Sequence, residues 1–456
     1  MSLTSLRQCV VSTTDTLMPE AVPPNNSARP VGGSTNEPVF ILDATPVEGG
    51  GPALAETSTV AATWALFLGL ALIMVGNGLQ GPLLAVRAEA EGFDLVVSGL
   101  IMAGYFVGFF AGSRYAEYAV TKVGHIRVFA GLASTASSTA IIHAVWVNPF
   151  SWVLLRMVFG LCMAGIYVVI ESWLSDLATN KTRGRLLAAY MVVTMAGLSG
   201  GQMLVGLGSA TGFTLFVVAS VLVSVSLVPV TLSAASGPPL SVPEPMGLAD
   251  LVDIVPTGAV TSFMNGLATG ALLPLFGAWM FQWPIGTISD KVSRRGVLAV
   301  VCLAGSTMSA LLALVEPGSG ASYVLMFFLG GTLFPMYSLS IAYTNDWLPP
   351  GKTMGASATL VRVNAGGAVL GPIIGATLMA VVAPSSLYWL ISVSFGVVTT
   401  YVMYRIVVAD APPEHRKSRF VAFPARASSS AVGLLTRRRT PQAIELDEQR
   451  DTNLNS

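Results

Sequence analysis

Long apolar runs dominate this sequence and decide what it can fold into. A hydrocarbon core about 30 Å thick requires about 20 apolar residues per helix. Ten runs of that kind lie near 60–84, 95–118, 128–147, 151–174, 186–208, 212–232, 297–316, 322–345, 355–380 and 385–405. Only 11% of the residues are charged, against about 25% in soluble domains. The runs therefore predict an all-α polytopic membrane protein.

The distribution of positive charge predicts the orientation of the spans. The apolar region 253–289 is counted as two spans, the seventh and eighth, which gives twelve in all. The loops after even-numbered spans, with their helix ends, hold ten basic residues: Arg114, Lys122, Arg127, Lys181, Arg183, Arg185, Lys291, Arg294, Arg295 and Lys352. The loops after odd-numbered spans hold only Arg87. Cytoplasmic loops carry the excess of Lys and Arg, so we expect a multi-pass protein of the inner or plasma membrane with both termini cytoplasmic.

The polar segments outside the spans set the expected domain boundaries. Residues 1–58 and 406–456 are expected to be disordered cytoplasmic tails, and 233–252 a cytoplasmic linker. The basic patches of the second tail could touch anionic lipid headgroups or simply be solvated. The expected helix bundles are 59–232 and 253–405.

An internal repeat relates the two expected bundles. A shift of 171 residues brings Gly160 onto Gly331 and Gly200 onto Gly371. The same shift brings Lys181, Thr182 and Gly184 onto Lys352, Thr353 and Gly355. The repeat predicts two parallel halves of six spans each, the architecture in which a substrate is held near the bilayer midplane between the halves.

Charged motifs in the connections carry a family resemblance over about residues 60–405. Gly286, Asp290, Lys291, Arg294 and Arg295 match the hinge pattern G-x-x-x-D-[RK]-x-G-[RK]-[RK], with Ser293 in place of its second glycine. The chain thus resembles the major facilitator superfamily. The strings QWPIG, VVIESWL, RGRLLAAYM and FPMYSLSIAYTNDWLP resemble its YcaD-type branch of bacterial permeases. The resemblance implies two pseudo-symmetric six-helix bundles.

The resemblance also implies a role for the hinge residues as an inner gate. In the first half Lys122 and Arg127 fit the hinge pattern, but Thr121 stands where its acid should be. Arg294 and Arg295 could pair with acids at the end of span 10, for example Asp346. Such a cluster could latch the gate, or it could only enforce topology.

Two charged residues on span 4 need a reason, because charge inside a membrane is costly. Arg156 and Glu171 lie about 22 Å apart along a helix and cannot pair with each other. Arg156 fits the family pattern R-x-x-x-G and could face the cavity, or reach the outer headgroups. Glu171 could meet Arg127, Arg183 or Arg185 at the gate, or take up a proton.

Polar side chains on spans 1, 4, 7 and 10 are candidates to line the substrate cavity. They are Asn77, Gln80, Tyr167, Asn265, Tyr337 and Tyr343. Amide and aromatic groups suit a small molecule with polar and apolar parts, although tyrosines can equally anchor helices at the membrane interface.

Spans 7 and 8 depart from the repeat. About 22 residues are missing between GALLPLF and GAWMFQWPIG. Spans 7 and 8 therefore form either a short hairpin or one merged helix, and the charge distribution favours the hairpin with a cytoplasmic hinge.

We expect a monomeric secondary transporter that works by alternating access, with proton-coupled efflux or uptake of a small polar metabolite as alternatives. A transport-inactive sensor or scaffold is a third hypothesis, which the short span 7–8 unit favours. Zero net charge does not suggest a nucleic-acid partner. No cofactor, metal or catalytic site is expected, because the histidines are scattered and no nucleophile–base pair stands out.

The predicted orientation can be tested by labelling. A cysteine placed at Ser293 should react with a membrane-impermeant thiol reagent only from the cytoplasmic side, because the hinge is expected there. Labelling from the cell exterior would contradict the twelve-span topology. The measurement compares modification in intact cells and in inverted vesicles.

Overall fold

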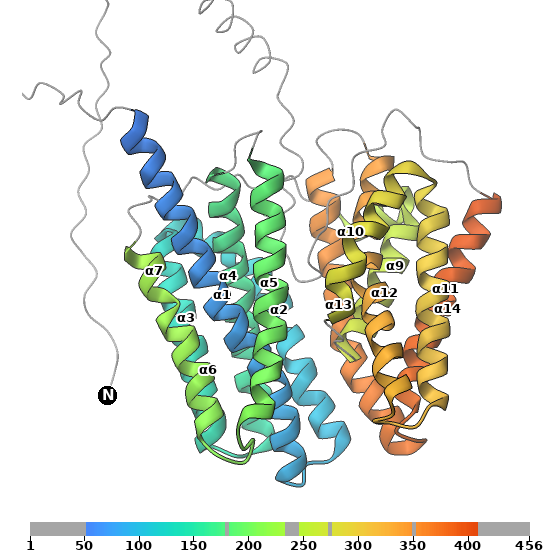
Figure 1. Cartoon of the computed structure of the whole chain (residues 1–456), viewed down its shortest axis with the longest axis horizontal. Helices are drawn as coiled ribbons and strands as arrows, with labels where there is room; N and C mark the ends of the chain where they lie inside the picture. The colour runs from blue at the N-terminus through green and yellow to red at the C-terminus, as the bar shows by residue number, and fades with distance from the viewer. Residues whose placement is uncertain (1–51, 178–181, 233–245, 272–275, 349–352, 409–456) are drawn as a thin grey trace, which may run out of the picture. The chain divides into compact units, whose positions relative to one another are not determined.

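The computed structural model describes residues 52–177, 182–232, 246–271, 276–348 and 353–408. Over these residues the chain is helical, apart from short turns (Figure 1). The helices are α1 (Pro52–Ala90), α2 (Leu95–Val123), α3 (His125–Val145), α4 (Pro149–Leu177), α5 (Arg183–Leu204), α6 (Thr214–Val225), α7 (Leu227–Leu232), α8 (Leu248–Ile254), α9 (Pro256–Ala271), α10 (Phe276–Lys291), α11 (Arg294–Leu314), α12 (Gly320–Trp347), α13 (Thr353–Val381) and α14 (Ser386–Val408). Within the described ranges, ten helical segments are long and apolar enough to cross a membrane. They coincide with the ten predicted spans.

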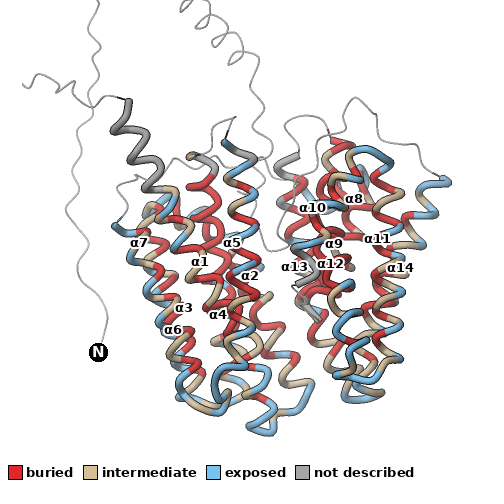
Figure 2. The backbone as a smooth tube through the Cα atoms, viewed as in Figure 1, coloured by how far each residue is buried: buried red, intermediate tan, exposed pale blue. Residues whose placement is uncertain are grey.

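The helices pack in two repeated sets. In the first set α2 packs on α4 and α1 on α5, with α3 and α6 outside them. In the second set α10 packs on α12 and α9 on α13, with α11 and α14 in the corresponding places. Figure 2 shows the buried residues along the inner faces of each set. This arrangement is the fold that the repeat predicts.

Glycines allow the backbones of the packed helices to touch. Gly78 of α1 faces the backbone of Leu198 on α5, and Gly201 of α5 faces the backbone of α1 in return. In the second set Gly266 of α9 faces the backbone of Asn364 on α13, and Gly367 faces Phe263. Lipid gives helices no hydrophobic drive to associate, so close approach at small residues stabilises the crossings.

These crossings fix the structural register of the repeat and locate the missing segment. Asn77–Gly78–Leu79 of α1 corresponds to Asn265–Gly266–Leu267 of α9, a shift of 188 residues. Lys122 at the end of α2 corresponds to Lys291 at the end of α10, a shift of 169. The difference, 19 residues, falls between the two crossings. The segment is therefore lost from the end of α9 and the start of α10.

The structure confirms the short hairpin and excludes a merged helix. Both α9 and α10 have 16 residues, which is about 24 Å of helix. Gly258 near the start of α9 lies against Thr344 in the last turn of α12. Arg294, which follows α10, pairs with Asp346 in that same turn. The start of α9 and the end of α10 thus lie at the same end of α12, so the chain reverses between them.

The two sets of helices touch mainly through α2 and α13. A Cβ at Gly99 of α2 would come within 2.7 Å of the Pro372 carbonyl oxygen on α13. The pseudo-symmetric pair, α5 and α10, makes little contact. By the 169-residue shift that relates Lys122 to Lys291, the counterpart of Gly99 falls before the first residue of α10. The residue that would make the counterpart contact is therefore absent from α10.

Three predicted boundaries differ from the helices of the structure. Helix α1 begins at Pro52, so residues 52–58 are helical instead of part of the tail. The segment PALAETS contains good helix formers such as Ala, Leu and Glu, with Pro at the first helical position, which favours an early start. Helix α8 occupies part of the expected linker, and α14 continues to Val408. Residues 1–51, 233–245 and 409–456 lie outside the described ranges.

The glycine crossings yield a matched pair of substitutions on α13. Gly367→Ala should lower stability by about 1–3 kcal/mol, because its methyl group would collide with the α9 backbone. Gly366→Ala should be neutral or stabilising by up to about 1 kcal/mol, because no described atom lies within 4 Å of the new methyl and Ala favours helix. Thermal unfolding in detergent measures both, and equal effects would contradict the crossing.

Candidate gating and coupling site

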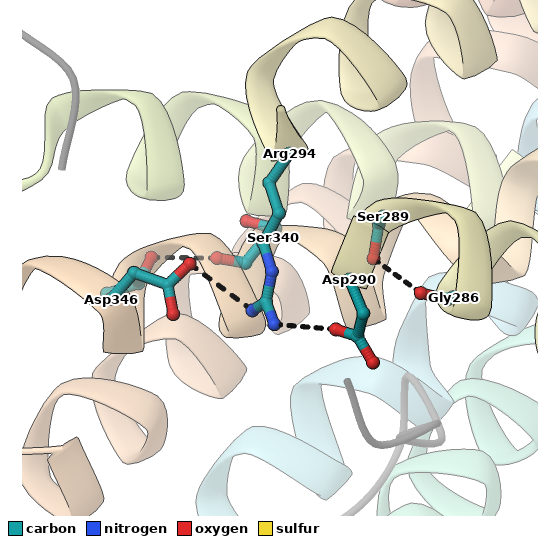
Figure 3. A network of polar contacts seen from close by, with 7 residues as sticks. Gly286, Ser289, Asp290, Arg294, Ser340 and Asp346 are labelled. Carbon is teal, nitrogen blue, oxygen red and sulfur yellow. Dashed lines mark hydrogen bonds and ion pairs between the residues drawn. The ribbon is translucent and has the colours of Figure 1, made fainter. Parts of the chain in front are cut away.

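The hinge after α10 holds a buried arginine between two carboxylates (Figure 3). Arg294 Nη2 donates to Asp290 Oδ1 at 2.9 Å, and its Nη1 lies 3.4 Å from Asp346 Oδ2. The side chains of Arg294 and Asp346 are each 2% exposed, whereas that of Asp290 is 26% exposed. The predicted pairing of Arg294 with Asp346 is therefore present.

The local sequence explains why Arg294 takes this position. Ser293 caps α11, and its hydroxyl accepts a long hydrogen bond of 3.5 Å from the Gly296 amide. Asp290 lies one turn before Arg294 along the chain, so the short hinge brings the two side chains together. Gly286 is buried, and its carbonyl accepts from the Ser289 hydroxyl at 2.7 Å. Lys291, in contrast, is exposed.

Arg295 also joins helices at this end of the second set, through a hydrogen bond and cation–π contacts. Its Nη1 donates to the Arg405 carbonyl at 3.1 Å. Its guanidinium also lies 5.9 Å from the centroid of the Tyr343 ring and 5.6 Å from that of Trp347. Cation–π contacts of this kind stabilise a buried guanidinium. Tyr343, a predicted cavity residue, thus lies against the hinge cluster, and its assignment to a cavity stays a prediction.

The hinge of the first half uses different chemistry. Lys122 and Arg127 are exposed, and Lys122 Nζ lies 4.9 Å from the centroid of the Tyr118 ring. His125 stands where Arg294 stands in the other half, and its Nε2 is 2.9 Å from the Ser172 hydroxyl. A histidine–serine contact therefore stands where the second half has the buried ion pair. The 169-residue register would have identified His125, which the motif comparison missed.

Glu171 lies fully buried on α4 and is held by a tyrosine. Tyr190 Oη of α5 donates to Glu171 Oε1 at 2.5 Å. The pairing of Glu171 with Arg127, Arg183 or Arg185 stays a prediction; Arg127 and Arg185 are exposed, and the side chain of Arg183 lies outside those described. Nothing in the sequence pattern singled out Tyr190.

Arg156 is buried within the first set of helices. The residue is only 5% exposed. Its guanidinium carbon lies 5.0 Å from the centroid of the Tyr105 ring and 5.8 Å from that of the Phe159 ring. A guanidinium enclosed by two rings inside the bundle does not fit a side chain that extends to the outer headgroups. Its orientation toward a substrate stays a prediction.

The six predicted cavity residues are all buried, with at most 6% exposure. Tyr167 Oη donates to the Met74 sulfur at 3.1 Å, which joins α4 to α1. Asn77, Gln80 and Asn265 lie in the glycine-rich crossing helices α1 and α9. Among the described residues, no group of three or more His, Cys, Asp or Glu side chains could hold a metal ion.

Comparison with known proteins agrees with this fold. A family model described as Major Facilitator Superfamily matches residues 66–255 and 252–444. The chain is 25% identical over 359 residues to an uncharacterized MFS-type transporter, YcaD, of Escherichia coli, covering 72% of this chain and 92% of that protein. It is 26% identical over 363 residues to the YcaD protein of Salmonella paratyphi B, with the same coverage.

Solved structures show the same arrangement of helices. The D-xylose–proton symporter matches with a TM-score of 0.61 and 12% identity, covering 80% of this chain and all of that one. The nucleoside transporter NupG matches with a TM-score of 0.57 and 13% identity, covering 76% of this chain and 99% of that one. At these identities the likeness concerns the fold alone. Helix arrangement, hinge motif and family model together establish that the chain belongs to the Major Facilitator Superfamily.

Proposed function

We propose that this protein is a secondary active transporter that moves a small molecule across the inner or plasma membrane by alternating access. The observation that carries the proposal is the buried Arg294 cluster, because it joins α10, α11 and α12 at the hinge end of the second set of helices. Paired six-helix halves with such hinges suit a rocking motion around a central site. We propose that both termini lie in the cytoplasm, because the basic residues predict this orientation.

Within the hinge, we assign different roles to the two carboxylates. Asp346 and Arg294 are both buried, so their pair is costly to separate and acts as a permanent tie between α11 and α12. Asp290 is partly exposed and can exchange Arg294 for water at lower cost. Asp290 is therefore the exchangeable half of the gate, together with the neighbouring Lys291. In the first half, Lys122 and Arg127 are the exposed counterparts.

For coupling, the proposal assigns the proton to Glu171. A buried carboxylate that accepts from Tyr190 is stabilised while charged, and uptake of a proton would release this hydrogen bond. Movement of α5 against α4 would follow from that release. The short α9–α10 hairpin also favours a second candidate, a transport-inactive sensor or scaffold.

The two hinge carboxylates should respond differently to neutralisation. Asp346→Asn should destabilise the protein by about 3–5 kcal/mol, because it leaves Arg294 buried with a weaker partner. Asp290→Asn should change stability by less than about 1 kcal/mol, since that pair is partly exposed, but should reduce transport. Thermal unfolding and transport assays separate the two effects. A stable and fully active Asp346→Asn variant would contradict the assignment.

Proton coupling can be tested in inverted vesicles loaded with a pH-sensitive dye. We expect at least one compound of a metabolite and drug panel to collapse the imposed proton gradient through the wild-type protein. Glu171→Gln should abolish the collapse while the protein still binds that compound, and Tyr190→Phe should retain it with an altered pH dependence. Gradient collapse by Glu171→Gln at the wild-type rate would exclude Glu171 as the proton site. Absence of transport for every compound, with and without a gradient, would favour the scaffold.

A further inference from the structure

Three buried amide side chains have polar atoms without hydrogen-bond partners among the described residues. Neither the Oδ1 nor the Nδ2 atom of Asn265 has one, and the same holds for Oε1 and Nε2 of Gln80. Asn77 lacks a partner for its Nδ2. Gln80 and Asn265 are 0% exposed and Asn77 is 6% exposed. A buried amide that makes no hydrogen bond destabilises a fold, so these side chains need another reason to be present.

Neighbouring polar groups in the same helices are satisfied, which makes the amides stand out. Asn364 of α13 is 4% exposed, and its Nδ2 donates to the Ser262 carbonyl of α9 at 2.9 Å. The hydroxyl groups of Thr261 and Ser340 are 2.5 Å apart and join α9 to α12. The α9 environment therefore supplies partners to Asn364, Thr261 and Ser340, while Asn265, one turn along α9, receives none from the described residues.

The asparagines occupy equivalent places in the two halves. Asn77 precedes Gly78, where α1 crosses α5, and Asn265 precedes Gly266, where α9 crosses α13. Each glycine touches the backbone of the opposing helix, so neither α1 nor α9 can rotate to expose its amide without losing the crossing. Gln80 lies three residues after Asn77 and so shares its helix face. The repeat thus holds polar side chains at one depth in both halves.

Buried charges, by contrast, are matched within the protein. Glu171 accepts from Tyr190, Arg294 pairs with Asp346, and Arg156 lies over aromatic rings. Single donors such as Trp173 Nε1 also lack described partners. Gln80 and Asn265 each leave both an amide donor and an amide acceptor unused among the described residues, and the hydroxyl groups of Thr194, Ser199 and Thr257 also lack described partners. The side chains that leave both a donor and an acceptor unused are therefore neutral amides and hydroxyls, and Gln80 and Asn265 are the amides among them.

Building on the transport function proposed above, we infer that the substrate is uncharged and carries both hydrogen-bond donors and acceptors, as hydroxyl or amide groups do. Asn77, Gln80 and Asn265 bind these groups and determine specificity. A site of this kind selects sharply, because a substrate that lacks the matching group leaves the buried amide unpaired. A charged substrate would need a counter-charge, and the buried charges already have partners within the fold.

The first test compares two asparagines by stability alone. Asn265→Leu keeps the branched arrangement and the number of side-chain heavy atoms and removes an unpaired amide, so the melting temperature should stay the same or rise by about 2 °C. Asn364→Leu removes a paired amide and should lower the melting temperature by at least about 2 °C. If Asn265→Leu lowers it as much as Asn364→Leu does, Asn265 has a structural partner and the inference is wrong.

The second test measures ligand binding to the purified full-length protein by thermal shift. The neutral probes are uridine and D-xylose, and the charged probes are tetraphenylphosphonium and lactate. At least one neutral probe should raise the melting temperature of the wild-type protein. The variants Asn77→Leu, Gln80→Leu and Asn265→Leu should each show a smaller rise, which corresponds to an apparent affinity for that probe at least tenfold weaker. Asn364→Leu should retain the shift, although it starts from a lower melting temperature.

The outcomes distinguish the substrate class from transport itself. A shift with a charged probe that survives Asn265→Leu, or no shift with either neutral probe, would overturn the inference. Gradient-driven transport of a charged compound would overturn it too, while leaving the proposed transport function intact. Binding of a neutral probe at Asn265 without transport of that probe would support the inference and argue against the transport function.

Discussion

Close contact between helix backbones at glycine is the interaction on which this structure depends. A helix in lipid gains nothing from burying apolar surface against another helix, so association rests on packing and on hydrogen bonds. Gly78 and Gly201 allow this approach in the first set, and Gly266 and Gly367 allow it in the second. Because the same pairs of helices cross in both sets, the polar residues next to the crossings are placed in equivalent positions. The geometry of the candidate substrate residues follows from this packing.

Buried charge is the second constraint, and each half satisfies it differently. The second half encloses Arg294 between carboxylates and Arg295 among aromatic rings and a carbonyl. The first half has a histidine–serine contact at the corresponding place and carries its buried carboxylate on α4, next to Tyr190. The halves are thus alike in backbone and unlike in chemistry. This asymmetry suits different roles for the two halves: the second half would carry the ionic gate and the first half the proposed proton site.

The sequence predicted the membrane spans because the length of an apolar run that crosses a bilayer is set by the thickness of its hydrocarbon core. The internal repeat and the family resemblance predicted how the spans are arranged. The sequence also predicted the Arg294–Asp346 pair, since few acids lie near that end of span 10. It could not predict that Tyr190 holds Glu171, because a hydroxyl partner on another helix leaves no mark in spacing or composition. The unpaired state of Asn265 was likewise hidden, because it depends on what the neighbouring helices offer. The short α9–α10 hairpin was predictable because a deletion changes the repeat distance.

The shortened hairpin has a consequence for the surrounding lipid. Helices of about 24 Å stand beside full-length neighbours in a hydrocarbon layer of about 30 Å. The bilayer next to α9 and α10 must thin locally, or headgroups and solvent must dip toward the midplane on that flank. Either adjustment costs elastic energy that grows with acyl-chain length. In membranes with longer lipids this elastic energy is therefore larger on the flank formed by α9 and α10. The equilibrium between the conformations of the protein then depends on the lipid composition of the membrane.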